Sequence, residues 1–295
     1  MVGPVLLASV LVADLAAAIA AYDEVLTYRP VDAGKVDGDL ARSWGAPGVS
    51  SNPFAVLAPE SGAPGWIRFV EGEVPPDHRP LASTGWAAIE ILVEDPDALA
   101  ARLADSPFDI IGPPAPLRSF PEIKAMQAIG PAGEVLYLTN VPSGGGEQDL
   151  PTVQSAVDRV FIVVLGVPDF DHALADFETG FSLPARPARE RGIYFIGPGY
   201  GLAVTDPLRM TTIQLAGKSL IQVDEYPADA PPRARANGGL PAGFAMTSFA
   251  VPSLAPYLDA ALAPPVRPSA APYEGRAAIT LHGPGGALIE LIETG

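Results

Sequence analysis

The sequence of 295 residues contains no cysteine and only three histidines, which are His78, His172 and His282. The absence of cysteine excludes disulfide bonds, thiolate nucleophiles and thiolate metal ligands, and it is compatible with an intracellular protein. With three histidines in the whole chain, a metal site made of two or three imidazole ligands is difficult to build. We therefore expect no metal and no other bound cofactor.

Positive charge is also scarce, because 18 Lys and Arg residues stand against 34 Asp and Glu residues and leave a formal net charge of −16. Such a surface repels phosphate backbones and anionic lipids, so we expect neither nucleic acid nor a membrane as a partner. Hydrophobic residues make up 48% of the chain, which is enough to bury a core. The expected partner is a small-molecule ligand or substrate, and the chain is expected to be a monomer or a homodimer.

The first 21 residues are strongly apolar, which raises the question of a signal peptide. A basic start is missing, since the first positive charge is Arg29, and Asp14 interrupts the apolar run. We therefore interpret this segment as the first strand and helix of the folded protein, and we expect a cytoplasmic location.

Common nucleotide-binding and hydrolase motifs are missing as well. The sequence has no phosphate-binding loop ending in Gly-Lys-Ser/Thr at the required spacing, no G-x-G-x-x-G between a strand and a helix, and no G-x-S-x-G elbow. Mechanisms that depend on those loops are therefore not indicated.

The chain does contain one pattern four times: a run rich in β-forming residues, a capping residue, and then helical spacing of apolar residues. The four runs and their caps are 6–13 with Asp14, 87–94 with Asp95, 161–168 with Asp169, and 245–252 with Ser253. Asp and Ser favour this position because their side-chain oxygens accept hydrogen bonds from the free N–H groups of a first helical turn. After the first cap, Leu15, Ile19 and Tyr22 are spaced as on one face of a helix.

Each interval between caps holds further strand-like runs, so every copy is predicted to be a strand, a helix and three strands. Glycine turns at 130–133 and 283–286 join strands as hairpins, and the Gly-rich stretch at 142–152 is interpreted as a linker. The predicted fold class is α+β, with four βαβββ modules that form two paired-module half-barrel (cup) domains. The predicted domains are 1–141, with modules at 1–72 and 83–141, and 153–295, with modules at 157–227 and 240–295.

This arrangement resembles the vicinal-oxygen-chelate superfamily, which includes glyoxalase I, bleomycin-resistance proteins, fosfomycin-resistance enzymes and extradiol dioxygenases. The resemblance covers nearly the whole chain. Its most specific fragments are Asp14-Leu15 after the first strand, GPAGEVLYL at 130–138 and GPGGALIEL at 283–291. The resemblance implies that paired modules curl into cups and that any site lies on a concave face.

In superfamily members that use a metal, the ligands are a first-strand His or Glu and a last-strand carboxylate of paired modules. The corresponding first-strand residues here are Leu7, Ala88, Ile162 and Met246. The corresponding last-strand residues are Arg68, Tyr137, Gln222 and Glu290. One carboxylate does not replace the lost hydration of a divalent cation. We therefore expect no metal site, and Glu290 would be a ligand only if a metal binds.

Two catalytic candidates, Glu90 and Tyr137, belong to the second module. Glu90 lies in an apolar strand, where a carboxylate must either pair with a base or face a wet cavity. Arg68 and Lys124 are candidate partners, and a purely structural ion pair is the alternative. Tyr137 replaces a ligand and is expected to point its hydroxyl into the cup, either to donate to a substrate or simply to fill space.

Two further catalytic candidates, His282 and Glu290, flank the turn at 283–286. If both face the cup, an imidazole beside a carboxylate is a proton-transfer pair, whereas an exposed turn histidine has no such role. The other candidates for substrate binding come from three arguments. The resemblance places Arg68, Gln222 and Met246 at ligand positions in the cups, and strand alternation turns Trp86 and Ser248 to the same faces. Lys124 could hold an anionic substrate near an acidic cup.

Three functions are compatible with these residues. The first is a metal-independent enzyme that transfers protons, of isomerase or lyase type, on a small carbonyl or aromatic metabolite. The second is a protein that binds or sequesters a small apolar molecule, as bleomycin-resistance proteins do. The third is a metal-dependent dioxygenase or glyoxalase with displaced ligands.

Overall fold

The structure is a computed structural model, and it describes residues 2–118, 120–142, 149–192 and 207–295. The strands are β1 (Val5–Val12), β2 (Arg29–Lys35), β3 (Pro53–Ala58), β4 (Trp66–Glu71), β5 (Gly85–Val93), β6 (Asp109–Leu117), β7 (Phe120–Ile129), β8 (Val135–Asn140), β9 (Val157–Val167), β10 (Arg189–Gly192), β11 (Pro207–Gln214), β12 (Leu220–Glu225), β13 (Gly243–Val251), β14 (Ala278–His282) and β15 (Leu288–Glu293). The helices are α1 (Leu15–Leu26), α2 (Gly38–Ser43), α3 (Pro96–Leu103) and α4 (Phe170–Phe181), with short 3-10 turns η1 (Pro47–Val49), η4 (Ala216–Lys218), η5 (Ala255–Ala260) and η6 (Pro284–Gly286).

The predicted caps start three of the four module helices. Asp14 accepts a hydrogen bond from the Ala17 N–H at the start of α1, and Asp95 and Asp169 cap α3 and α4 in the same way. The expectation of a fourth α-helix after Ser253 is wrong, because that segment forms only the 3-10 helix η5. Prolines follow at 264 and 265, where they cannot continue a helix.

Within the described ranges, the strands form one sheet of seven strands and one of eight. We call the seven-stranded sheet, with the order β14-β15-β13-β1-β4-β3-β2, sheet A. We call the eight-stranded sheet, with the order β10-β11-β12-β9-β5-β8-β7-β6, sheet C. Sheet A therefore combines the first module with the fourth, through the antiparallel pair β1 and β13, while sheet C combines the second with the third, through β5 and β9. This corrects the expectation that residues 1–141 and 153–295 would each pair their own modules. The linker predicted at 142–152 falls mostly outside the described residues, and its described ends carry no helix or strand.

Both predicted hairpins are present. The turn at 130–133 joins β7 to β8, with Ile129 opposite Val135, and the turn at 283–286 joins β14 to β15, with His282 opposite Leu288. The apolar amino terminus forms β1 and α1, as predicted. In the described part of the chain, no helix is long and apolar enough to cross a membrane.

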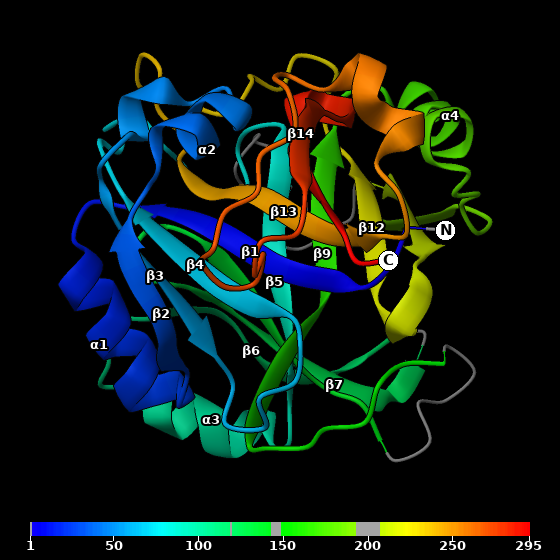
Figure 1. Ribbon diagram of the computed structural model, residues 1–295. Coiled ribbons are helices and arrows are strands. Elements are labelled where there is room, and N and C mark those ends of the chain that lie inside the picture. Colours follow the sequence, from blue (N-terminus) through cyan, green and yellow to red (C-terminus); the bar gives the residue numbers. More distant parts are fainter. Residues whose placement is uncertain (1, 119, 143–148, 193–206) are drawn as a thin grey trace.

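The two sheets pack against each other face to face, and their strands cross (Figure 1). The main hydrophobic cluster lies between them and includes Val10, Phe69, Ile91, Val163 and Leu291. Helices α1, α3 and α4 pack on the sheets beside this layer. We call the opposite face of each sheet, turned away from the other sheet, its cup face.

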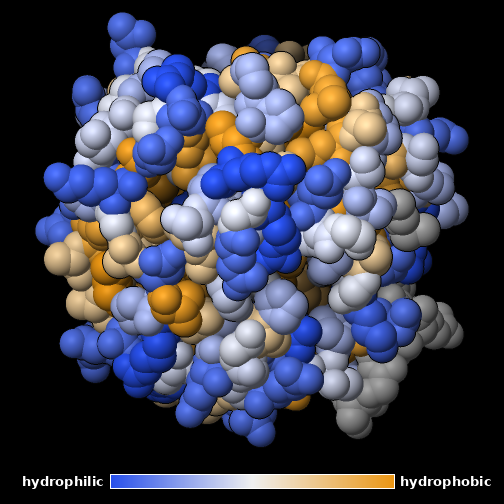
Figure 2. Space-filling view, viewed as in Figure 1, coloured by the Kyte–Doolittle hydropathy of each residue, from blue (hydrophilic) through white to orange (hydrophobic). Residues whose placement is uncertain are grey.

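The cup face of sheet C is strongly curved. Arg189 on β10 lies 5.3 Å from the ring centre of Phe120 on β7, although five strands separate β10 from β7 in the sheet. The cup of sheet A is filled by a hydrophobic cluster that includes Leu40 of α2 and Trp44 just after it. Over this side of the molecule, hydrophilic side chains cover most of the surface and hydrophobic ones show between them in separate patches (Figure 2).

Candidate functional site

The cup face of sheet A holds a buried polar cluster on its four central strands. Ser9 on β1 is the register partner of Arg68 on β4, and Ser248 on β13 is the register partner of Glu290 on β15. Side chains of register partners lie on the same face, so these four groups meet over the middle of the cup. Arg68 and Glu290, which occupy two of the last-strand positions compared with metal ligands above, thus come together as an ion pair.

The two oxygens of Glu290 are fully engaged. Oε1 accepts hydrogen bonds from Trp44 Nε1 and the Tyr273 hydroxyl, both at 2.7 Å, and Oε2 accepts from the Ser248 hydroxyl at 2.5 Å. Arg68 lies 3.5 Å from Oε2, a weak direct contact, and it is linked more closely through the Tyr273 hydroxyl at 2.5 Å.

Arg68 is also held from its other sides. Its Nε donates to the Ser9 hydroxyl at 3.0 Å, and its guanidinium lies 4.3 Å from the centre of the Trp44 ring. Burial lowers the pKa of Arg68, but Tyr273 and Glu290 more than offset this effect, so its pKa is raised overall. Arg68, Trp44, Tyr273 and Glu290 are each at most 1% exposed, so this cup is closed over a charged but saturated cluster.

The predicted pair of His282 and Glu290 is not formed. Glu290 lies opposite Thr280 on β14, whereas His282 lies opposite Leu288 at the end of that strand and is exposed. Met246 lies in the hydrophobic cluster of the sheet A cup, and Ser248 there serves the ion pair. The sheet A candidates therefore form a structural cluster, with no oxygen of Glu290 free for a substrate.

The cup face of sheet C carries a different arrangement. Glu90 on β5 is the register partner of Tyr137 on β8, so the two predicted residues lie side by side on this face. The Thr139 hydroxyl donates to Glu90 Oε1 at 2.6 Å. Glu90 and Tyr137 keep 8% and 9% of their surface exposed, whereas Glu290 in the other cup keeps none.

Burial changes the acidity of both groups. The pKa of Glu90 is raised to about 7, chiefly by desolvation and further by Asp224, while the Thr139 hydrogen bond acts to lower it. The pKa of Tyr137 is raised well above its usual value of 10.0, chiefly by desolvation and then by Asp224, Tyr226 and Glu90. Near neutral pH, Glu90 can therefore change between its ionised and protonated forms, and Tyr137 is a neutral hydroxyl.

Further polar groups border this site on β12. Gln222 Nε2 lies 3.0 and 3.1 Å from the two carboxylate oxygens of Asp224, which is fully buried. Gln222 was predicted from its ligand position, whereas Asp224 and Thr139 were not. Both missed residues are two positions from a predicted one on the same strand, so strand alternation was the signal that pointed to them.

Three predicted positions lie elsewhere. Arg68 belongs to sheet A and does not pair with Glu90, and Lys124 forms an exposed ion pair with Asp97 near α3. Trp86 faces the core between the sheets, where its Nε1 donates to the Leu288 carbonyl oxygen at 2.7 Å. Alternation predicted that Trp86 would lie on the cup face, but a register shift between Trp86 and Ala88 breaks that alternation.

In the described part of either cup, no donor set fits a divalent metal. In sheet A, the one carboxylate at a ligand position is saturated and lies beside an arginine, which would repel a cation. In sheet C, the corresponding residues are Ala88, Tyr137, Ile162 and Gln222. Across the described ranges, no three His, Cys, Asp or Glu side chains are grouped as metal ligands.

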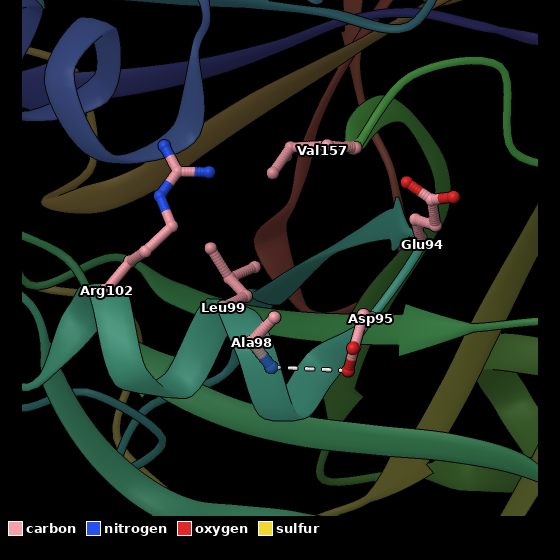
Figure 3. Close-up of a pocket in the computed structure, with 7 residues that line it drawn as sticks. Glu94, Asp95, Ala98, Leu99, Arg102 and Val157 are labelled. Carbon is pink, nitrogen blue, oxygen red and sulfur yellow. Dashed lines mark hydrogen bonds between the residues drawn. The ribbon is translucent and has the colours of Figure 1, made fainter.

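Two surface cavities lined by described residues lie outside the cups. One, of about 110 Å³, is bordered by Asp95, Leu99, Arg102 and Val157, and there Asp95 caps the Ala98 N–H (Figure 3). The other, of about 200 Å³, lies between α1 and the turn at 130–133. The Asp95 side chain at the first cavity and the Asp14 side chain at the second are both already engaged as helix caps.

The architecture defined by these two cups is the vicinal-oxygen-chelate fold. The chain aligns with glyoxalase I from Zea mays over 98% of this chain and 92% of that chain, at a TM-score of 0.64 and 15% identity. It aligns with a putative dioxygenase from Bacillus subtilis over 99% of this chain and 85% of that chain, at a TM-score of 0.62 and 15% identity. No protein-family model matches the chain, and no curated protein matches its sequence. The likeness therefore shows the fold and leaves the reaction to the site.

Proposed function

We propose that the cup of sheet C is a metal-independent proton-transfer site, of isomerase or lyase type, for a small carbonyl or aromatic metabolite. The observation that carries the proposal is Glu90, a carboxyl group with a pKa of about 7 on the cup face beside Tyr137. A carboxyl group whose pKa lies near the working pH is suited to accept a proton and to return it.

The chemistry follows from the two protonation states. Ionised Glu90 removes a proton from the carbon next to a substrate carbonyl, the C–H electron pair moves into the new C=C bond, and the carbonyl oxygen gains negative charge. The neutral Tyr137 hydroxyl stabilises that charge by donating a hydrogen bond. Protonated Glu90 then returns its proton to another atom of the enolate, which completes an isomerisation.

The surroundings of Glu90 favour a substrate without net charge. On one side the cup face holds an apolar cluster with Ala88 and Val164, and on the other side a cluster with Leu92 and Ile162. A carboxyl group flanked by two apolar clusters matches a ligand with one polar group and an apolar body.

The first test is exchange of substrate hydrogen for solvent deuterium. Neutral ketones and aldehydes are incubated with the protein in D2O, and deuterium next to the carbonyl is followed by NMR. We expect exchange by the wild type and a rate at least ~100-fold lower for Glu90→Gln, because the general base is lost. Glu122→Gln, an exposed change on β7 of the same sheet, is the matched control. Equal exchange by wild type and Glu90→Gln would refute the proposal.

The two apolar clusters also favour a second candidate, a protein that binds a small apolar molecule without reaction. The same NMR samples separate the two functions. Broadened ligand lines with no deuterium uptake, in both the wild type and Glu90→Gln, would support binding and argue against proton transfer.

Metal independence is tested by elemental analysis of protein expressed with iron, manganese, zinc and nickel supplied. We expect less than about a tenth of an equivalent of any of these metals, because the described residues of both cups form no suitable donor set. Deuterium exchange should also persist after treatment with EDTA. A stoichiometric metal that is lost in Glu290→Ala would contradict the proposal and restore the chelate chemistry of the fold.

A further inference from the structure

We propose that Thr139 is a positioning residue that assigns different roles to the two oxygens of Glu90, so that Oε1 is held and Oε2 exchanges the proton. This inference rests on the proposed function of the sheet C cup. Thr139 lies on β8 two residues beyond Tyr137, and its register partner on β5 is Leu92. It therefore lies diagonally across from Glu90 on the same face.

The contact is specific to one oxygen. The Thr139 hydroxyl donates to Glu90 Oε1 at 2.6 Å, and Thr139 is only 2% exposed, so water does not readily replace it. From the described residues, no hydrogen bond reaches Glu90 Oε2, while the residue as a whole keeps 8% exposure. The proton taken up by Glu90 is therefore placed on Oε2, the oxygen left available to a ligand.

Comparison of the two cups separates this arrangement from simple burial. In sheet A, a hydroxyl from a neighbouring parallel strand also holds the carboxylate, as Ser248 on β13 donates to Glu290 on β15. There, however, Trp44 and Tyr273 occupy the second oxygen. Both cups thus hold one carboxylate oxygen with a hydroxyl group. Among the residues that the structure describes, the sheet C cup provides no donor for the other oxygen.

The Thr139 hydrogen bond also favours the ionised form of Glu90. Desolvation by burial raises the pKa of Glu90, and the charge of Asp224 on β12 raises it further. The hydrogen bond from Thr139 on β8 lowers the pKa of Glu90. From β9 the register partner is the apolar Ile162. Removal of the hydroxyl is therefore expected to move the titration of Glu90 to higher pH.

The test uses Thr139→Val, which keeps the shape and removes the hydroxyl, and Thr139→Ser, which keeps the hydroxyl. The titration of Glu90 is followed by the infrared band of the protonated carboxyl group, assigned by subtraction of Glu90→Gln. We expect Thr139→Val to raise the midpoint by about one pH unit, and Thr139→Ser to stay near the wild type. The buried carboxyl of Glu134, which also has a pKa of about 7, is an internal control that should not move.

Once an exchanging compound is known, the midpoint of its pH–rate profile should rise by the same amount in Thr139→Val and return in Thr139→Ser. An unchanged Glu90 midpoint in Thr139→Val, with the protein folded by circular dichroism, would overturn the positioning role. If the midpoint shifts as expected but the wild type exchanges no compound, the proposed function fails and the assignment of the two oxygens stands.

Discussion

Glu290→Leu is expected to lower the free energy of unfolding by about 3–5 kcal/mol, measured by urea denaturation at pH 7. The change leaves the Arg68 guanidinium buried without its carboxylate, and Arg68 is only 1% exposed. It also removes the acceptor of Trp44 Nε1 and of the Tyr273 hydroxyl. Buried donors without acceptors and an uncompensated buried charge act in the same direction.

The double variant Arg68→Met/Glu290→Leu tests whether the unpaired buried charge of Arg68 causes the loss of stability. Removing both charges should cost less than the sum of the two single changes, because no lone charge remains buried. Lys124→Met breaks the exposed ion pair with Asp97 and is expected to change stability by no more than about 0.5 kcal/mol. Additive effects of the Arg68 and Glu290 changes would show that the two residues do not depend on each other.

The buried pair of Arg68 and Glu290 also explains how the two cups differ. In sheet A, a guanidinium and a carboxylate at two ligand positions link the first module to the fourth, and tryptophan and tyrosine side chains seal the cluster. A closed cup whose carboxylate is saturated can stabilise the fold, but it offers a ligand no free oxygen of Glu290. In sheet C, the one described donor to Glu90 is the Thr139 hydroxyl, and Glu90 retains some exposure. The candidate function therefore lies in one cup, and the other cup carries stability.

Local features of the fold were predictable from the sequence because they depend on neighbouring residues. The caps at Asp14, Asp95 and Asp169 and the glycine turns at 130–133 and 283–286 act within a few residues, and all formed as expected. The β2 strand and α2 were not predicted. For β2 the reason is that residues 29–35 are mostly exposed and lack a hydrophobic alternation.

The pairing of modules was not predictable in this way. Leu7 on β1 lies opposite Ser248 on β13, at the far end of the chain, and local patterns do not encode which strands meet at that distance. The error also misplaced Arg68, which was expected near Glu90 and lies near Glu290. For Trp86, a register shift within β5 reversed the face that strict alternation predicts.

The side-by-side placement of Glu90 and Tyr137 was predictable because it depends only on two strands of one module. Both residues face the cup of sheet C, as alternation from the ligand positions indicated. What the sequence could not supply is the degree of burial that sets the pKa of Glu90, since that depends on the third module and on Asp224 of β12.

A second buried carboxyl group, Glu134, is expected to make stability depend on pH. It lies in the turn between β7 and β8 and is 1% exposed, and its oxygens accept from the Tyr22 hydroxyl of α1 at 2.7 Å and from the Ala132 N–H at 2.9 Å. Desolvation raises its pKa to about 7 from an ordinary value of 4.5, against the lowering effect of these hydrogen bonds.

The raised pKa means that the folded state holds a proton on Glu134 that the unfolded chain releases near pH 4.5. Its contribution to stability is therefore complete below about pH 4.5 and is lost as the pH rises through about 7. The loss on going from acidic to mildly alkaline pH is about 3 kcal/mol for this one group, from the size of the pKa difference. Glu134→Gln, which cannot ionise, should remove that share of the pH dependence.

The measurement is the free energy of unfolding by urea at pH 5 and at pH 8, in the wild type and in Glu134→Gln. The absolute stability of Glu134→Gln also reflects a changed hydrogen bond to Tyr22 or to the Ala132 N–H. The quantity to compare is therefore the change in the free energy of unfolding between pH 5 and pH 8. Glu122→Gln, at an exposed position, should leave that difference unchanged. If Glu134→Gln keeps the full pH dependence of the wild type, the carboxyl of Glu134 is already ionised in the fold. The Tyr22 contact would then bind a carboxylate at pH 5, with burial too weak to retain the proton.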